Sequence, residues 1–296
     1  MPPLLRKKEK GQNCATSLAG EVRNTVMSKT LQIKEVPKWV RGSLMVGAFG
    51  FLYWLERFRP LRREVEPKLL RNERNLTVAA ISAAVLQITE RPVIAALCSL
   101  VEKRKLGILK YVKLPIWIEV PLAVVLMDYT LYGWHVLTHR LPWLWRFHVV
   151  HHLDLDMDAS TALRFHFAEQ LASIPWRAGQ VLLLGVSPRS FAVWQNFLFL
   201  SILFHHSNMR LPLEFERSLN RFIVTPRMHG IHHSIVQAET DSNWSSGLTL
   251  WDWLHGTLNR NVLQDEITIG VPTYSERDET TLAKILFLPF NLKKEI

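Results

Sequence analysis

The chain has 296 residues, of which 48% are hydrophobic, and its formal net charge is +10. Such a positive balance fits either nucleic acid or an anionic membrane surface as partner. The basic residues crowd beside apolar stretches, for example between Arg57 and Arg63, and no zinc-finger, RRM or basic-zipper pattern is present. We therefore expect a membrane and no nucleic acid. The two cysteines exclude a disulfide framework.

The predicted elements are all helices, and they begin after a basic N-terminal tail at residues 1–38. The tail lacks the apolar segment of a signal peptide. Residues 43–55 are apolar but shorter than the roughly 20 residues that a perpendicular span needs, so a buried helix or a re-entrant segment fits them. Residues 76–89 and 93–101 are separated by Glu90-Arg91-Pro92 and together predict a kinked span.

Three further apolar segments follow and lead to histidines. Residues 114–137 carry His135 near their end. Residues 171–186 and 191–204 are separated by Pro188, which predicts a helical hairpin that ends at His205 and His206. We place all of these segments in one membrane-embedded domain, residues 39–260, followed by a C-terminal tail at residues 261–296. The apolar patch 285–290 of that tail is expected to rest on lipid.

All twelve histidines lie between His135 and His255. Eight of them form one H-x-x-x-H and two H-x-x-H-H motifs, and ligands at these spacings share one face of a helix. Imidazole is the commonest metal-ligand side chain. By chance, one H-x-x-H-H is expected only about 0.02 times in such a chain. We therefore interpret as metal ligands His135, His139, His148, His151, His152, His229, His232 and His233.

Eight imidazoles predict two metal ions, because a structural zinc takes only four ligands. Additional ligand candidates are His166, His205 and His206. Asp128 lies seven residues before His135, so it is expected to orient that ligand from the second coordination shell. Weaker candidates for the same role are Glu169, Asp241 and Asp252.

The chemistry of the ligands and their place beside apolar segments indicate an enzyme that acts on lipid. Imidazole suits iron, zinc, copper and nickel, and oxygen chemistry needs a redox metal, which zinc is not. Two iron ions are the expected cofactor, although an imidazole-rich site can hold zinc after purification. The sequence has no G-x-G-x-x-G fingerprint for a dinucleotide, so the electrons must come from a separate donor.

These motifs resemble the fatty acid hydroxylase superfamily, over roughly residues 120–258, and the nearest likeness is to bacterial-type sterol desaturase proteins. The resemblance is carried by Asp128 and by five runs: LWRFHVVHH (144–152), TALRFH (161–166), HHSNMRLP (205–212), TPRMHGIHHS (225–234) and DSNW…LWDWLHGT (241–257). It implies an all-α, polytopic helical membrane protein with a histidine-rich di-metal cap that faces the cytosol. It also implies the eight motif histidines as ligands, with His205 or His206, or else His166, in a further ligand position. Leu153, Phe167 and Trp253 depart from the family pattern and leave the substrate open.

The resemblance and the residues together predict a membrane-bound non-haem di-iron oxygenase. It would hydroxylate or desaturate a C–H bond of a sterol, fatty acyl or related lipid, with O2 and electrons from a ferredoxin or from cytochrome b5 with its reductase. A carotenoid substrate stays open as well. The alternative from another class is a membrane metal-binding or transport protein without oxygenase activity.

Overall fold

The computed structural model describes residues 37–291, so the predicted basic tail lies almost wholly outside the described residues. Up to Leu44 the described chain is the first part of a helix, α2 (Lys38–Phe58), and the account below concerns the compact unit that begins at Met45. The boundaries of the three predicted regions stay a prediction.

Within the described residues the protein is helical, and its extended pairings are three isolated bridges, which confirms the all-α prediction. The longer helices after α2 are α3 (Lys68–Ile88), α4 (Glu90–Arg104), α5 (Ile116–Arg140), α6 (Pro142–His152), α7 (Phe167–Leu184) and α8 (Pro188–His206). The shorter ones are α9 (Leu213–Leu219), α10 (Pro226–His232), α11 (Gln237–Thr240), α12 (Leu250–His255) and α13 (Leu282–Phe287), with five 3₁₀ turns at 108–110, 161–163, 272–274, 277–280 and 288–290.

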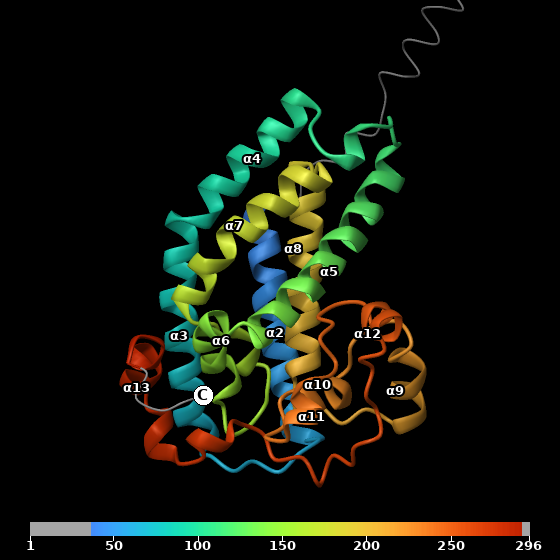
Figure 1. Ribbon diagram of the computed structural model, residues 1–296. Coiled ribbons are helices and arrows are strands. Elements are labelled where there is room, and N and C mark those ends of the chain that lie inside the picture. The colour runs from blue at the N-terminus through green and yellow to red at the C-terminus, as the bar shows by residue number, and fades with distance from the viewer. Residues whose placement is uncertain (1–36, 292–296) are drawn as a thin grey trace, which may run out of the picture. The chain divides into compact units, whose positions relative to one another are not determined.

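Four long helices, α4, α5, α7 and α8, pack side by side into a bundle (Figure 1). They share one apolar core, whose buried members are Ile94, Cys98, Val101, Met127, Leu131, Val181, Leu184, Phe191 and Trp194, together with Val186 between α7 and α8. Helix α3 runs beside α7 and α4 and continues below the bundle. The core therefore occupies the upper part of the bundle and leaves the lower ends of α5 and α8 free to carry histidines.

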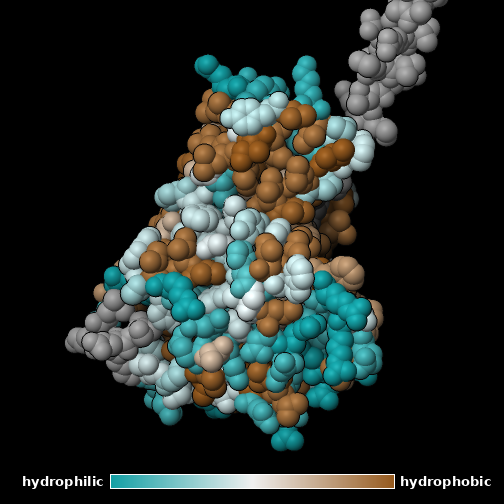
Figure 2. Space-filling model, turned by 45° about the vertical axis from the view of Figure 1, so that its right-hand side comes forward, coloured by the Kyte–Doolittle hydropathy of each residue, from teal (hydrophilic) through white to brown (hydrophobic). Residues whose placement is uncertain are grey.

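The outer surface of the bundle is unusually apolar (Figure 2). Large side chains such as Trp117, Leu183 and Leu200 are exposed there, which a water-facing surface would not favour. By length and composition, α5 could cross a membrane, and so could α3 together with the segment Glu90–Lys110 if that bent pair is one span. One or two such candidates support contact with a membrane, while the polytopic arrangement stays a prediction.

The two breaks between helices that the sequence predicts, at Glu90-Arg91-Pro92 and near Pro188, are present in the structure. Helix α3 ends at Ile88 and α4 begins at Glu90, with a bend of 41° between the two parts. The hairpin between α7 and α8 turns at Gly185, whose φ of 79° favours glycine. A Cβ on Gly185 would also lie 2.6 Å from the carbonyl oxygen of Leu106, so the hairpin packs closely on the loop after α4.

The segment that the sequence analysis treats as a C-terminal tail packs on the protein. Ile285 is fully buried against Val78 of α3 and Val150 of α6. Arg146 of α6 donates to the carbonyl oxygen of Pro289 at 2.8 Å. Only part of the apolar patch at residues 285–290, including the exposed Phe287, is thus open to lipid.

A buried charge network ties α3 to the loop that follows α6. Asp154, with no exposed surface, accepts from Arg71 at 3.1 Å and from Asn75 at 2.8 Å, and Arg164 lies 3.4 Å away. Although burial raises the pKa of Asp154, Arg71 and Arg164 hold it below its ordinary value. Arg71 also pairs with Asp158. Since this loop starts directly after His152, the network fixes the end of the ligand-bearing helix α6.

Replacement of Asp154 by Asn should destabilise the protein strongly, because it leaves the buried Arg71 and Arg164 without their shared charge. We expect a loss of about 3–5 kcal/mol in the free energy of unfolding. The matched control is Glu214→Gln, which removes a carboxylate from the exposed pair with Arg217 and should cost only about 0–1 kcal/mol. Denaturant unfolding in detergent micelles measures both, and equal effects would contradict the structural role of the network.

Candidate metal centre

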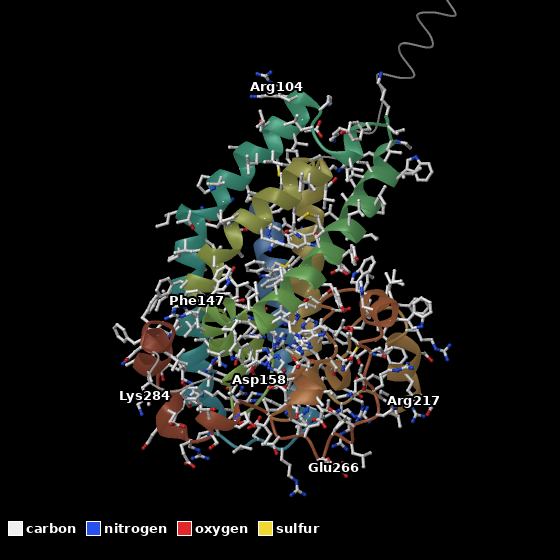
Figure 3. The ribbon with its side chains drawn as sticks, in the orientation of Figure 1. Arg104, Phe147, Asp158, Arg217, Glu266 and Lys284 are labelled. Carbon is white, nitrogen blue, oxygen red and sulfur yellow. The ribbon has the colours of Figure 1, made fainter. Side chains whose placement is uncertain are left out.

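The motif histidines, together with His205 and His206, meet at the lower ends of α5, α6 and α8 and on the short helix α10. His135 and His139 end α5, the second motif ends α6, and His205 and His206 end α8. The third motif lies on α10 and its C-terminal cap. Figure 3 shows the ring nitrogens crowded where these helices meet. Prolines at the first positions of α6 and α10 start each ligand helix where its histidines can turn inward.

The structure brings eight histidines together in two groups of four. In each group, one nitrogen from every ring lies within 4.8 Å of the others. The first group joins His135, His139, His152 and His232, and the second joins His151, His206, His229 and His233. The groups are neighbours, since the rings of His152 and His233 stack with centroids 4.2 Å apart. The two H-x-x-H-H motifs therefore do not make one site each but contribute to both groups.

Hydrogen bonds to backbone carbonyls determine which nitrogens of the first group carry protons. Nδ1 of His135 donates to the carbonyl oxygen of Trp244 at 2.7 Å, and Nδ1 of His232 donates to that of Ser242 at 2.9 Å. A carbonyl oxygen only accepts, so the Nε2 atom of each neutral ring has a free lone pair. These two Nε2 atoms lie 3.1 Å apart. Burial lowers the pKa of His232 to about 3, so its ring is neutral near pH 7 and no proton lies between the two Nε2 atoms.

In the second group a backbone carbonyl fixes the tautomer of one ring, that of His206. Its Nδ1 donates to the carbonyl oxygen of Ile202 at 2.8 Å, so its Nε2 is unprotonated. That Nε2 lies 3.0 Å from Nε2 of His151 and 3.1 Å from Nε2 of His229. Nε2 of His229 lies in turn 3.2 Å from Nε2 of His233.

These spacings fit a metal ion in each group. Two nitrogens bound at about 2.1 Å to one ion, at roughly 90–110° to each other, lie about 3.0–3.4 Å apart. A cation between facing lone pairs also removes their mutual repulsion. The buried Nε2 of His139 and both ring nitrogens of His152 lack hydrogen-bond partners within the described part of the chain, which suits coordination. The donor set, all imidazole, is one that iron and zinc accept.

His148, the remaining motif histidine, lies beside both groups without belonging to either. Its ring centroid is 4.9 Å from that of His139 and 5.4 Å from that of His151. Nδ1 is 2.8 Å from a carboxylate oxygen of Glu169, and the buried Nε2 has no partner among the described residues. A carboxylate behind the ring is the usual support of a metal-bound histidine. Glu169 thus has the geometry that the sequence analysis considered for it.

The three additional ligand candidates have different places. His206 belongs to the second group, whereas His205 lies beside it and lines a cavity. His166 lies outside both groups: its Nδ1 accepts from the backbone N–H of Ala168 and caps α7, and its Nε2 is 3.2 Å from the carbonyl oxygen of Leu286. The structure therefore gives His166 a structural contact with the C-terminal segment instead of a ligand position.

Asp128 does not orient a histidine directly, in contrast to the expectation from its spacing. One of its oxygens accepts from the backbone N–H of Leu248 at 2.9 Å and from the indole of Trp251 at 2.7 Å. It thereby anchors on α5 the loop that carries Trp244. Asp252 accepts from the backbone N–H of Trp244 at 2.8 Å, so it supports the same loop. Asp241 instead pairs with Arg140.

The acceptors that do orient His135 and His232 are backbone carbonyls of Trp244 and Ser242, which the sequence analysis missed. Backbone carbonyls leave no signature in the residue type. A signal was nevertheless present in the run DSNW, which starts at Asp241 and matches the family pattern. Asn243 in this run has a φ of 54°, a left-handed conformation that asparagine tolerates better than most residues.

A cavity of about 210 Å³ opens beside the histidines. Its apolar walls include Leu131, Trp134 and Leu198 from the long helices, and histidines of both groups form one end. A polar stripe on α7, from Glu169 to Arg177, lines another side. An alkyl segment in this cavity would lie against both groups and away from bulk water.

Replacement of His232 by Ala should lower the number of bound metal ions, because it removes a ligand nitrogen from the first group. The control is His166→Ala, which should keep the wild-type metal content and lower stability by about 1 kcal/mol through loss of the helix cap. Metal analysis of the purified variants measures both. A full complement of metal in the His232 variant would contradict the assignment.

Removal of metal by a chelator should lower the thermal stability of the protein, since facing lone pairs then repel each other in the core. A ligand present at 100 times its dissociation constant stabilises the folded state by about 2.7 kcal/mol. Thermal unfolding before and after addition of zinc to the stripped protein tests this. An unchanged midpoint at saturating zinc would show that the groups do not bind metal in the folded state.

Comparison with known proteins agrees with this geometry. The sequence model of the fatty acid hydroxylase family matches residues 120–257. The chain is 34% identical over 160 residues to ornithine lipid hydroxylase OlsE of Rhizobium tropici. It is 29% identical over 169 residues to alkylglycerol monooxygenase of Danio rerio and 31% identical over 153 residues to a cholesterol 25-hydroxylase-like protein of the same fish.

These matches cover 53%, 57% and 49% of this chain, and 46%, 36% and 56% of the three relatives, so the chain spans about half the length of the curated relatives it matches. No solved structure matches the chain significantly. The matched region contains every motif histidine, both groups and the loop that supports them. Residues 120–257 are therefore similar to the fatty acid hydroxylase superfamily.

Proposed function

We propose that this protein is a membrane-bound non-haem di-iron oxygenase that oxidises a C–H bond of a lipid. The observation that carries the proposal is the pair of tetra-histidine groups at one end of a mostly apolar cavity. The relatives support it, because their names describe hydroxylation or monooxygenation of an ornithine lipid, an alkylglycerol and cholesterol.

The ligand set that we propose consists of the eight motif histidines and His206. Eight of these nine form the two groups, and His148 is the ninth; its ring centroid is 4.9 Å from that of His139, and its Nε2 has no partner among the described residues. When bound, two iron ions would supply the reduction of O2 and the oxidant that breaks an unactivated C–H bond. The electrons come from a separate donor such as a ferredoxin or cytochrome b5 with its reductase.

The protein's own residues position the substrate and keep water away. Leu131, Leu198 and Ile202 present an apolar wall to an alkyl chain, and the ring of Phe165 stacks on His151 with centroids 4.3 Å apart. The narrow cavity limits how an acyl chain lies against the ligands. Glu169 holds the ring of His148, and the carbonyl oxygens of Trp244 and Ser242 hold the rings of His135 and His232.

The bundle is the part of the protein that we place in the membrane, with the histidine-bearing lower region in the cytosol. The exposed apolar side chains of the bundle support this arrangement. The cavity lies between the lower ends of α5, α7 and α8, so a lipid can approach it from the bilayer side. Hydroxylation and desaturation start with the same attack on a C–H bond, and the names of the relatives favour hydroxylation.

Iron-loaded protein, prepared without oxygen and supplied with dithionite, O2 and a lipid extract, should produce an oxidised lipid. With isotopically labelled O2, mass spectrometry should find one labelled oxygen in the product for hydroxylation and none for desaturation. His151→Ala and His232→Ala should abolish the product, whereas His255→Ala should retain it, because the exposed His255 stacks on Tyr129 and Tyr132 outside both groups.

The same preparation distinguishes the alternative function. A metal transporter would move metal across sealed vesicles without consumption of O2. Metal flux without any oxidised lipid would therefore replace the oxygenase proposal, and retained turnover in the His151 or His232 variant would overturn the ligand set.

A further inference from the structure

A second large hollow lies on the outer side of the helix that carries the third histidine motif. This basic groove has a volume of about 640 Å³ and is formed by α9, α10 and the loop at residues 260–264. Met228 and Ile231 of α10 line it, and they precede His229 and His232 in the chain. His229 lines the substrate cavity. One helix of seven residues thus separates the groove from the ligands.

The groove is strongly cationic. Four arginines line it, together with a single carboxylate, and they are Arg217, Arg221, Arg227 and Arg260. The carboxylate, Glu216, is buried and neutralised, because both its oxygens accept from Arg227 at 2.8 and 3.0 Å. Asp265 and Glu266 follow the loop in sequence but do not line the hollow.

Two of the arginines, Arg221 and Arg260, are free to receive a partner. The other two are paired: Arg227 with Glu216, and Arg217 with the exposed Glu214 at 2.7 Å. Arg221 and Arg260 are exposed, and neither takes part in any ion pair found among residues 37–291. An uncompensated pair of charges in a hollow attracts acidic partners and accelerates their encounter.

The walls of the groove are firmly joined to the ligand helix. The ion pair of Glu216 with Arg227 links α9 to α10, and Asn220 donates to Thr225 at 3.3 Å and to the sulfur of Met228 at 3.0 Å. The amide oxygen of the same side chain, Oδ1 of Asn220, is buried without a partner in the described part of the chain. A partner seated here would contact a rigid surface one residue from two proposed ligands.

We propose that the basic groove is the docking site of an acidic one-electron carrier protein, an inference that rests on the proposed oxygenase function. The reaction needs electrons from outside, and the substrate occupies the opposite side of α10. The groove brings the carrier against Met228 and Ile231, which precede the proposed ligands His229 and His232, without passage through the cavity. Its concave shape fits a protruding acidic protein surface better than a flat bilayer, and the exposed Leu213 and Leu263 beside the charges suit a protein contact.

The test uses zinc-loaded protein in detergent micelles, which cannot turn over, and two acidic probes: the soluble domain of cytochrome b5 and a [2Fe–2S] ferredoxin. Wild-type protein should bind at least one probe at low ionic strength and release it as salt rises, because the Debye length falls from about 30 Å at 0.01 M to about 10 Å at 0.1 M. The double variant Arg221→Glu/Arg260→Glu should weaken the dissociation constant about tenfold or more. Its metal content should equal that of wild type, since both side chains are exposed.

The matched control is Arg63→Glu/Lys284→Glu, which makes the same change in charge at two exposed residues that do not line the groove. Figure 3 shows Lys284 and the groove residue Arg217 on opposite sides of the view. The control should bind the probes as wild type does. An equal loss in both variants would reduce the effect to net charge and overturn the proposal.

Two other results would also overturn it. One is the absence of binding by the wild-type protein to either probe. The other is a variant that keeps its affinity for the carriers but loses affinity for phosphatidylglycerol vesicles, which would make the groove a lipid contact. Lipid oxidation by the wild-type iron protein with dithionite is scored separately, so failure of the docking site and failure of the oxygenase proposal are distinguishable.

Discussion

Lone pairs of two buried imidazoles, those of His135 and His232, face each other in this protein, with the two Nε2 atoms 3.1 Å apart. Backbone carbonyls hold the proton of each of these two rings on the far nitrogen, so the rings cannot relieve the repulsion by a change of tautomer. Burial keeps the pKa of His232 far below neutrality. A cation bound between the two rings would remove this repulsion.

The rest of the fold supports the positions of the histidines that form the two groups. Two ligand-bearing helix ends, those of α5 and α8, come from a bundle with its own apolar core, so their direction is determined well away from the histidines. The loop after α6 is held by the buried network around Asp154, and the loop that carries Trp244 is held by Asp128 and Asp252. Asp128 and Asp252 accept from backbone N–H groups of the loop that carries Trp244, whereas Asp154 accepts from side chains of α3. None of these contacts is with a motif histidine.

Periodicity and motif spacing predicted much of this structure, because both depend on helix geometry. They predicted the helical class, the kink at Glu90-Arg91-Pro92, a hairpin at Pro188 and the convergence of the motif histidines. They did not separate His205 from His206, since neighbouring residues on a helix differ only in direction. They also did not find the buried role of Asp154, because three aspartates within five residues are ordinarily exposed. The contacts of the carbonyl oxygens of Trp244 and Ser242 with the histidine rings could not be predicted, because every residue type has a backbone carbonyl.

The short helix α10 shows why the loops matter as much as the bundle. Seven residues are too few to form a stable helix alone, so its position depends on neighbours. Arg62, expected among charges that face lipid, instead donates to the carbonyl oxygen of Pro226 at 2.8 Å. Its guanidinium lies where a Cβ on residue 230 would be, only 1.6 Å away, so glycine at Gly230 allows the arginine to close over α10. The glycine inside the third motif therefore belongs to the support of α10, because a side chain there would displace the Arg62 guanidinium from its contact with Pro226.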